Sequence, residues 1–228
     1  MKCLLCGGES APSVRDMVRC GDCGLFQKKE LPTIEQMKDG GRGFMLSACG
    51  SDEGTARRIG NANRSLDLLE RHVPPGKIYD VGAAAGFVMK AAKDRGWTVR
   101  GNELSTLAID WAKKRFDIDI EYGVLEEMRF VDGEFDVVSF WNTLEHMHNP
   151  ASALMVADMM LRHGGFMYFK VPVKDEHGVQ KSYEKLHTVE FSDGALTGHL
   201  GRLGYKVVVK ELIGKDFFKA MILLARKA

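Results

Sequence analysis

The stretch Ile78-Tyr-Asp-Val-Gly-Ala-Ala-Ala-Gly-Phe87 decides the fold of this chain. An apolar run ends in Asp80, a short glycine-flanked turn follows, and a helix-forming segment comes next. This order predicts a buried strand that leads through a tight loop into a helix. Such a loop presents backbone N–H groups to a ligand at the carboxyl edge of a sheet.

A second strand with an acidic end follows about twenty residues later. Val99-Arg-Gly-Asn-Glu103 ends in a carboxylate, which at this place can accept hydrogen bonds from ribose hydroxyl groups. The two stretches together predict a site for a nucleoside-containing cofactor.

The composition is that of a soluble globular protein. The chain has 228 residues, 45% apolar and 28% charged, which allows one good core and a small appendage. A net charge of +1 indicates neither a nucleic-acid binder nor an acidic tail. No apolar run approaches the roughly 20 residues of a membrane span. The start of the chain lacks a signal peptide's apolar core, so we expect a cytoplasmic protein with reduced cysteines.

Four of the five cysteines form a C-x2-C-x13-C-x2-C pattern. They are Cys3, Cys6, Cys20 and Cys23. Two residues between thiolates let one turn direct both sulfurs at one ion, and a second such turn completes a tetrahedron. Gly7 and Gly24 follow the two pairs and suit turns with positive φ. The pattern predicts a structural Zn²⁺ site, and a reducing compartment disfavours the disulfide or redox alternative. Cys49 stands apart, and we expect a small buried or loop residue there.

The charge balance of this module bears on its role. Within residues 1–35, basic and acidic side chains balance, whereas a nucleic-acid reader normally carries a basic stripe. This favours a structural or substrate-positioning role over RNA binding.

The predicted domain organisation has three parts. Residues 1–30 form the four-cysteine module, residues 31–75 a linker or lid with a helix, and residues 76–228 the main domain. The glycine-rich segment 36–54 fits a lid that orders on ligand binding and equally fits a simple linker. Apolar spacing over 55–72 predicts a helix, which Pro74-Pro75-Gly76 ends.

Strands and helices alternate through the main domain. Predicted strands are 77–81, 97–101, 118–122, 135–140 and 165–171, and predicted helices are 85–95, 106–116, 150–162 and 192–203, the last capped by Ser192. Residues 206–212 and 217–225 are two further strands joined by a short link, which forces a hairpin and makes the last strand antiparallel to the rest.

A parallel α/β sheet that finishes in such a hairpin resembles the class I S-adenosylmethionine (SAM)-dependent methyltransferases. The resemblance covers roughly residues 55–228. Its motifs are Asp80-Val-Gly-Ala-Ala-Ala-Gly86, Gly101-Asn-Glu103, Gly133-Glu-Phe-Asp-Val-Val-Ser-Phe140, Leu144-Glu-His146 with Asn149-Pro150, and the pre-strand glycines Gly164-Gly165. It implies a Rossmann-like three-layer sandwich with a mostly parallel seven-stranded sheet. With its four-cysteine module, the chain is similar to zinc-ribbon methyltransferases that act on sugars, other small molecules or rRNA.

The resemblance also implies a cofactor site for SAM. Its residues would be Asp80, Gly82, Ala83, Gly86, Phe87, Glu103, Leu104, Val124, Leu125 and Asn142. Asp80 would order the loop and accept from the cofactor's ammonium group, and Glu103 would take the ribose hydroxyls. The family's loop usually reads D-x-G-x-G-x-G, but the middle glycine here is Ala84. Gly123-Val124 stands where the family often has an acidic residue, which shifts adenine recognition to backbone amides and apolar contacts.

Histidines supply the candidates for proton transfer. His187, in Leu-His-Thr-Val-Glu-Phe-Ser192, resembles the family's His-containing segment before a Phe-Ser helix start, which implies a general base. A satisfied structural histidine is the competing interpretation. His146 would line the cleft, and with His148 it makes a poor metal site without a third partner.

The sequence therefore predicts a SAM-dependent methyltransferase with a structural Zn²⁺ ion that acts on a small-molecule acceptor, such as a sugar or another metabolite. One alternative is an rRNA or tRNA methyltransferase that holds RNA with its zinc module. Another is a non-catalytic SAM-binding domain whose zinc module recruits a protein partner.

Overall fold

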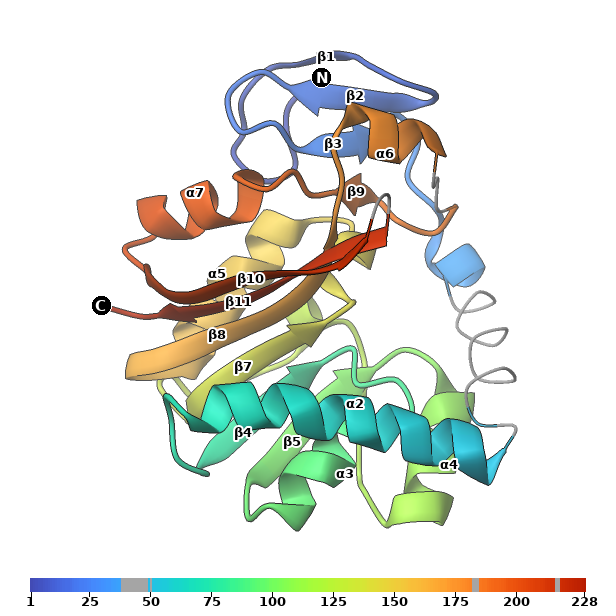
Figure 1. The fold of residues 1–228 in the computed structure, drawn as a ribbon, viewed down its shortest axis with the longest axis vertical. Coiled ribbons are helices and arrows are strands. Elements are labelled where there is room, and N and C mark those ends of the chain that lie inside the picture. Colours follow the sequence, from blue (N-terminus) through green and yellow to red (C-terminus); the bar gives the residue numbers. More distant parts are fainter. Residues whose placement is uncertain (38–48, 50, 182–184, 216–217) are drawn as a thin grey trace.

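Two β-sheets organise the chain in the computed structural model, which describes residues 1–37, 49, 51–181, 185–215 and 218–228. The larger sheet contains β4 (Lys77–Val81), β5 (Thr98–Glu103), β6 (Glu121–Tyr122), β7 (Phe135–Trp141), β8 (Leu161–Val173), β10 (Lys206–Lys215) and β11 (Phe218–Arg226). Their order is β10-β11-β8-β7-β4-β5-β6 (Figure 1). Strands β6, β5, β4, β7 and β8 pair in parallel, and β11 pairs antiparallel with both β8 and β10. The predicted fold class is thereby confirmed.

Helices cover both faces of this sheet. On one face lie α2 (Asp52–Glu70) and α3 (Phe87–Asp94), whose buried Leu66 and Ala92 pack in one cluster with Val137. On the other face lie α5 (Pro150–Met160) and α7 (Ala195–Arg202), which pack with Val138. Because successive strand residues point to opposite faces, Val137 and Val138 belong to separate clusters. The mostly apolar sequence of β7, broken by Asp136 and Ser139, is explained by burial on both faces.

The smaller sheet joins the two ends of the sequence. It contains β1 (Ser10–Pro12), β2 (Met17–Cys20), β3 (Phe26–Lys28) and, from far along the chain, β9 (Val189–Glu190), in that order. In Figure 1 it lies above the larger sheet, with β9 beside β3 and the short helix α6 (Glu176–Lys181) close by. Leu5 and Leu25 share a buried cluster with Val189 and Phe191, so the core runs without interruption between the two sheets.

Several element boundaries differ from the sequence-based predictions. The third predicted strand shortens to Glu121–Tyr122. The fifth starts at Leu161, so Gly164 and Gly165 lie inside β8 and α5 ends at Met160. The predicted Ser192 cap was wrong: α7 begins at Ala195 after Gly194, and the Ser192 hydroxyl instead donates to the Cys23 carbonyl at 3.5 Å. Most of the predicted lid, residues 38–48 and 50, lies outside the described residues.

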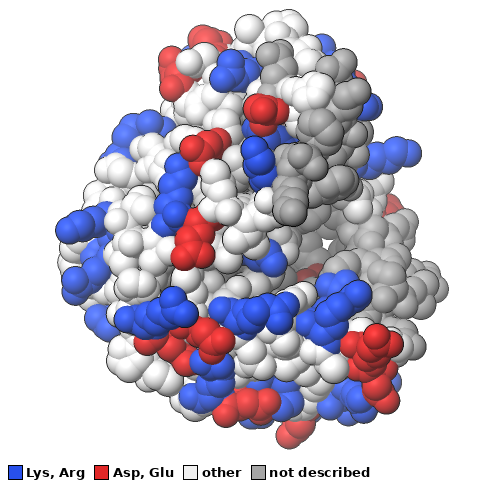
Figure 2. Space-filling view, in the orientation of Figure 1, with Lys and Arg blue, Asp and Glu red and all other residues white. Residues whose placement is uncertain are grey.

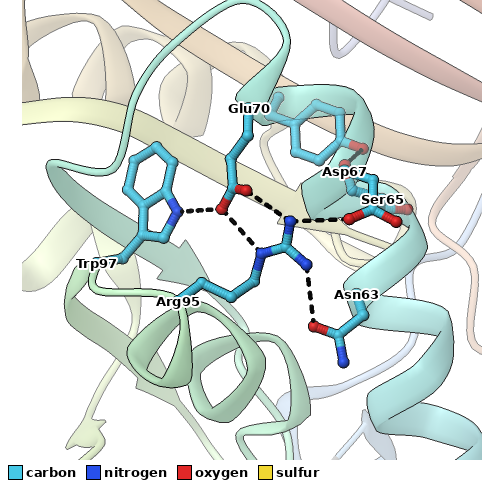
Figure 3. A network of polar contacts seen from close by, with 7 residues as sticks. Asn63, Ser65, Asp67, Glu70, Arg95 and Trp97 are labelled. Carbon is cyan, nitrogen blue, oxygen red and sulfur yellow. Dashed lines mark hydrogen bonds and ion pairs between the residues drawn. The ribbon is translucent and has the colours of Figure 1, made fainter.

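A polar network ties α2 to the start of β5 (Figure 3). Arg95 donates to Asp67 at 2.8 Å and to both carboxylate oxygens of Glu70, at 2.9 and 2.5 Å. Glu70 also accepts from the indole N–H of the buried Trp97 at 2.9 Å. The network adds polar contacts to the apolar packing that holds α2 against the sheet.

The visible surface is mixed in charge. On the face in Figure 2, Lys and Arg side chains alternate with Asp and Glu, in line with the small net charge. None of the helices in the described part of the chain has the length and hydropathy of a membrane span.

Candidate functional site

A cavity of about 820 Å³ opens at the carboxyl ends of the parallel strands. Strand order reverses at β4, between β5 and β7, and ligands of open α/β sheets bind at such a reversal. The loops after β4, β5, β6 and β7 all contribute to the wall, as do α2 and the segment before β9. The cavity is therefore built by the same strand ends that the sequence indicated.

The loop after β4 depends on left-handed backbone at three positions. Gly82, Ala84 and Gly86 have φ of 64°, 48° and 71°. Gly86 is the N-cap residue of α3, and a Cβ there would contact Ala112 at 3.3 Å. Gly82 and Ala84 line the cavity, whereas Gly86 lies behind it, against α4 (Thr106–Phe116). All three positions thus have backbone that favours glycine, and alanine occupies the middle one.

Glu103 at the end of β5 is bonded to the neighbouring loops. One carboxylate oxygen accepts from the Leu104 and Ser105 amides at 2.7 and 2.8 Å, and the other accepts from the Ala84 amide at 2.9 Å. A carboxylate has about four lone-pair sites, so these three bonds orient it and leave room for a hydroxyl donor. The contact with Ala84 joins the two acidic strand ends found in the sequence.

Asp80 is buried beneath the loop, where the Ser139 hydroxyl of β7 donates to it at 2.6 Å. Burial raises the pKa of Asp80 to about 7, opposed by the Ser139 bond and reinforced by the charge of Glu103. A carboxyl with such a pKa changes its charge near neutral pH. A cation placed next to it would stabilise the ionised form.

The structure brings most of the predicted site residues together around this cavity. Asp80, Gly82, Ala83, Phe87, Glu103, Leu104, Val124, Leu125, Asn142 and His187 line it, together with His146 and His148. Asn142 has a positive φ of 48° at the turn after β7, and its amide donates to the Lys170 carbonyl at 2.7 Å. Among the predicted cofactor residues, Gly86 is the one outside the lining.

A compact group of polar side chains closes one end of the cavity. The rings of His146 and His187 meet edge to face, with centroids 4.7 Å apart. His146 Nδ1 lies 3.1 Å from the Leu186 carbonyl, and burial lowers the pKa of His146 to about 4. Because a carbonyl oxygen can only accept, His146 carries its proton on Nδ1. His146 is therefore neutral in the free protein near pH 7.

His187 is oriented by a buried carboxylate that the sequence did not single out. Its Nδ1 lies 3.0 Å from Glu190 Oε1, and the Lys174 ammonium donates to the same oxygen at 2.7 Å. Glu190 and Lys174 are 3% and 7% exposed. Because a carboxylate oxygen accepts, the neutral form of the His187 ring carries its proton on Nδ1, toward Glu190, and its lone pair on Nε2. The i, i+3 spacing of His187 and Glu190 was the only available sequence signal.

Other lining residues were also missed. The lining also includes Arg58 and Asn61 of α2, Trp141 of β7 and Lys170 of β8. The Lys170 Nζ atom lies 5.2 Å from the centroid of the Trp141 ring. Helix α2 was predicted as a helix, but its sequence gives no sign that it faces the site.

The four N-terminal cysteines form a second site. Their sulfur atoms all lie within 4.8 Å of one another, with Cys3–Cys23 and Cys6–Cys20 separations of 3.6 and 3.5 Å. Gly7 and Gly24 have φ of 74° and 75°, which confirms the predicted turns. Four thiolates about 2.3 Å from a central ion would stand at similar separations, so the donor set and its geometry fit Zn²⁺.

Comparisons with known proteins agree with this geometry. Residues 79–169 match the family model described as "Methyltransferase domain". The ubiquinone biosynthesis O-methyltransferase of Thiobacillus denitrificans is 32% identical over 99 residues, which cover 41% of this chain and 43% of that protein. The enzyme of the same name from Pseudomonas fluorescens (strain SBW25) is 30% identical over 102 residues, or 41% and 43% of the two chains. The chain thus spans less than half the length of these curated relatives.

Solved structures share the fold. A SAM-dependent methyltransferase from Archaeoglobus fulgidus superposes with a TM-score of 0.64 at 14% identity, covering 81% of this chain and 98% of that one. One from Methanosarcina mazei gives 0.60 at 13% identity, with 70% and 96% covered. These likenesses support the class I SAM-dependent methyltransferase fold inferred from the motifs.

Proposed function

We propose that this chain transfers a methyl group from SAM to a small-molecule acceptor, with a Zn²⁺ ion held by its four cysteines in a structural role. The observation that carries the proposal is the cavity, which unites the glycine loop, Glu103 and His187 at the strand-order reversal. The matching family model and the names of the curated relatives support methyl transfer to a small molecule.

In this proposal, one group of cavity residues binds the cofactor, and His187 serves the acceptor. Glu103, already oriented by three amides, accepts from the ribose hydroxyls, and Asp80 receives the cofactor's ammonium group directly or through water. Val124 and Leu125 flank the adenine, while Gly82, Ala83, Phe87, Leu104 and Asn142 complete the cofactor side. Gly86 contributes by turning the chain into α3.

Bound SAM supplies a methyl group on a cationic sulfur, ready for in-line displacement by the acceptor. His187 serves an acceptor whose hydroxyl or carbon must lose a proton: its Nε2 takes that proton while Nδ1 stays bonded to Glu190. The imidazolium that forms lies beside the Glu190 carboxylate, which stabilises its positive charge.

Calorimetric titration with S-adenosylhomocysteine, the product form of the cofactor, tests the proposal. We expect micromolar binding by the zinc-loaded protein. Glu103→Ala should weaken it at least tenfold, because the ribose loses its carboxylate partner. Glu126→Ala is the matched control, since Glu126 lines the same cavity, and it should change the affinity less than threefold. A wild-type protein that binds neither SAM nor S-adenosylhomocysteine would disprove the proposal.

A further inference from the structure

The segment that carries His187 is built into the sheet of the four-cysteine module. In the pairing of β3 with β9, Phe26 lies opposite Glu190 and Gln27 opposite Val189. The Lys28 amide extends this ladder by donating to the Thr188 carbonyl at 3.0 Å, and the Lys28 ammonium donates to the Lys185 carbonyl. The backbone from Thr188 to Glu190 is therefore an edge of the module's sheet.

Strand β3 is also hydrogen-bonded to the first cysteine turn. The buried Gln27 side chain accepts from the Leu4 amide and donates to the Lys2 carbonyl, both at 2.8 Å, on either side of Cys3. The second turn also contacts the segment, because the Ser192 hydroxyl donates to the Cys23 carbonyl. Both cysteine pairs are thus connected to residues 188–192 through one or two hydrogen bonds.

The other side of the segment meets the main domain. The Thr188 amide donates to the Glu145 carbonyl at 2.8 Å, and the Lys174 amide donates to the Phe191 carbonyl at 2.8 Å. The His187 segment therefore lies between the module and the strand ends that build the cavity. Removing either support leaves it hydrogen-bonded on one side only.

Several charged and titratable side chains lie around His187. Glu190 of β9 faces His187 and Lys174, and the Lys174 ammonium balances the Glu190 carboxylate. From the 3-10 helix η2 (Leu144–His146), His146 and the buried Glu145 approach the same group. Burial raises the pKa of Glu145 to about 8, so it is mostly neutral at pH 7. Among the residues that the structure describes, the Glu190 carboxylate is consequently the negative charge bonded to the His187 ring.

We propose that the four-cysteine module positions the base: its metal-loaded sheet holds β9 in register, and Glu190 is the positioning residue that fixes the Nδ1–H tautomer of His187. This inference rests on the proposed function, in which His187 accepts the acceptor's proton. The inference gives the module a role in the site itself. Because metal binding by such modules is coupled to their folding, loss of the metal should loosen the sheet that holds β9.

Hydrogen exchange and cofactor affinity, measured on the full chain with and without metal, test the inference. After Cys20→Ser, or after chelation of the wild-type metal, amide exchange in residues 187–191 should accelerate at least tenfold. The affinity for S-adenosylhomocysteine should change less than threefold, because Glu103 ends β5 and residues 82–87 follow β4, and neither of these strands pairs with β9. If Cys20→Ser does not fold, chelation followed by readdition of Zn²⁺ supplies the same comparison. Unchanged protection of residues 187–191 after metal loss would overturn the inference.

Glu190→Gln separates positioning from metal binding. Its zinc content should equal that of the wild type, while the ¹⁵N spectrum of the His187 ring should shift from the pure Nδ1–H form toward a mixture of tautomers. Glu9→Gln is the control, because Glu9 pairs with Lys2 on the exposed surface of the same module. An unaltered His187 spectrum in Glu190→Gln would remove Glu190 from its positioning role. Failure of the zinc-loaded wild type to bind S-adenosylhomocysteine would instead count against the proposed function.

Discussion

Gly82 lies directly against Thr143: a Cβ atom on Gly82 would stand 2.4 Å from Thr143 Cγ2. The glycine comes from the loop after β4 and the threonine from the turn after β7, and both line the cavity. The loop can approach the neighbouring strand end only because this position has no side chain.

Gly82→Ala should therefore lower the free energy of unfolding by about 1–3 kcal/mol through overpacking and left-handed backbone strain. Thr143→Ser removes the clashing methyl group, so the double variant should recover part of the loss. Urea denaturation of all four proteins gives the coupling energy, which we expect to exceed about 0.5 kcal/mol. Strictly additive losses would show that the Gly82–Thr143 approach does not limit this loop.

Ala84 occupies left-handed backbone, with φ of 48°, where alanine costs about 1–2 kcal/mol more than glycine. Ala84→Gly should relieve this strain, and the greater freedom of glycine in the unfolded chain offsets about 0.5–1 kcal/mol. The variant should be as stable as the wild type or more stable by up to about 1.5 kcal/mol. Ala83→Gly, at a neighbouring buried position without positive φ, should be destabilising in the same thermal melts.

Asp80 should make the affinity for the proposed cofactor depend on pH. Its pKa of about 7 in the free protein should fall when the cofactor's ammonium group binds beside it. Below pH 7 Asp80 is protonated in the free protein, so binding must release its proton and the affinity should rise with pH. Above pH 7 Asp80 is already ionised, so the affinity should level off. Titration calorimetry at pH 6 in buffers of different ionisation enthalpy should detect release of nearly one proton. Asp80→Asn should abolish it, and equal release by that variant would assign the proton elsewhere.

In the network of Figure 3, Glu70 should contribute more to the free energy of unfolding than the exposed Asp67 does. Glu70→Ala leaves the N–H of the buried Trp97 without its acceptor and should cost about 1–3 kcal/mol. Asp67→Ala breaks a pair whose carboxylate is 54% exposed and should cost less than about 1 kcal/mol. Hydrogen bonds from Arg95 lower the pKa of Glu70, so its contribution is present above the ordinary glutamate pKa and is lost as pH falls below it. Equal losses at pH 7 would contradict this ranking.

The side of the cavity that we propose for the cofactor was predictable because it is built from local patterns. A strand, a tight loop and a helix within residues 78–87 specify the first strand end, and Glu103 follows at the next one. Parallel strands bring their carboxyl ends to one edge, so the two segments meet wherever the sheet forms. The cysteine turns were predictable for the same reason, since C-x2-C spacing and the following glycine act within one turn.

The opposite end of the cavity required the folded chain. The sequence alone determined the αβ alternation, the closing hairpin, the loop after β4 and the two cysteine turns, because each depends on residues a few positions apart. Only the tertiary structure decided that β9 joins the module's sheet, that Lys174 and Glu190 pair beside His187, and that α2 lines the site. Those contacts join segments remote in sequence, such as Phe26 with Glu190, and only the packing of the shared core brings them together.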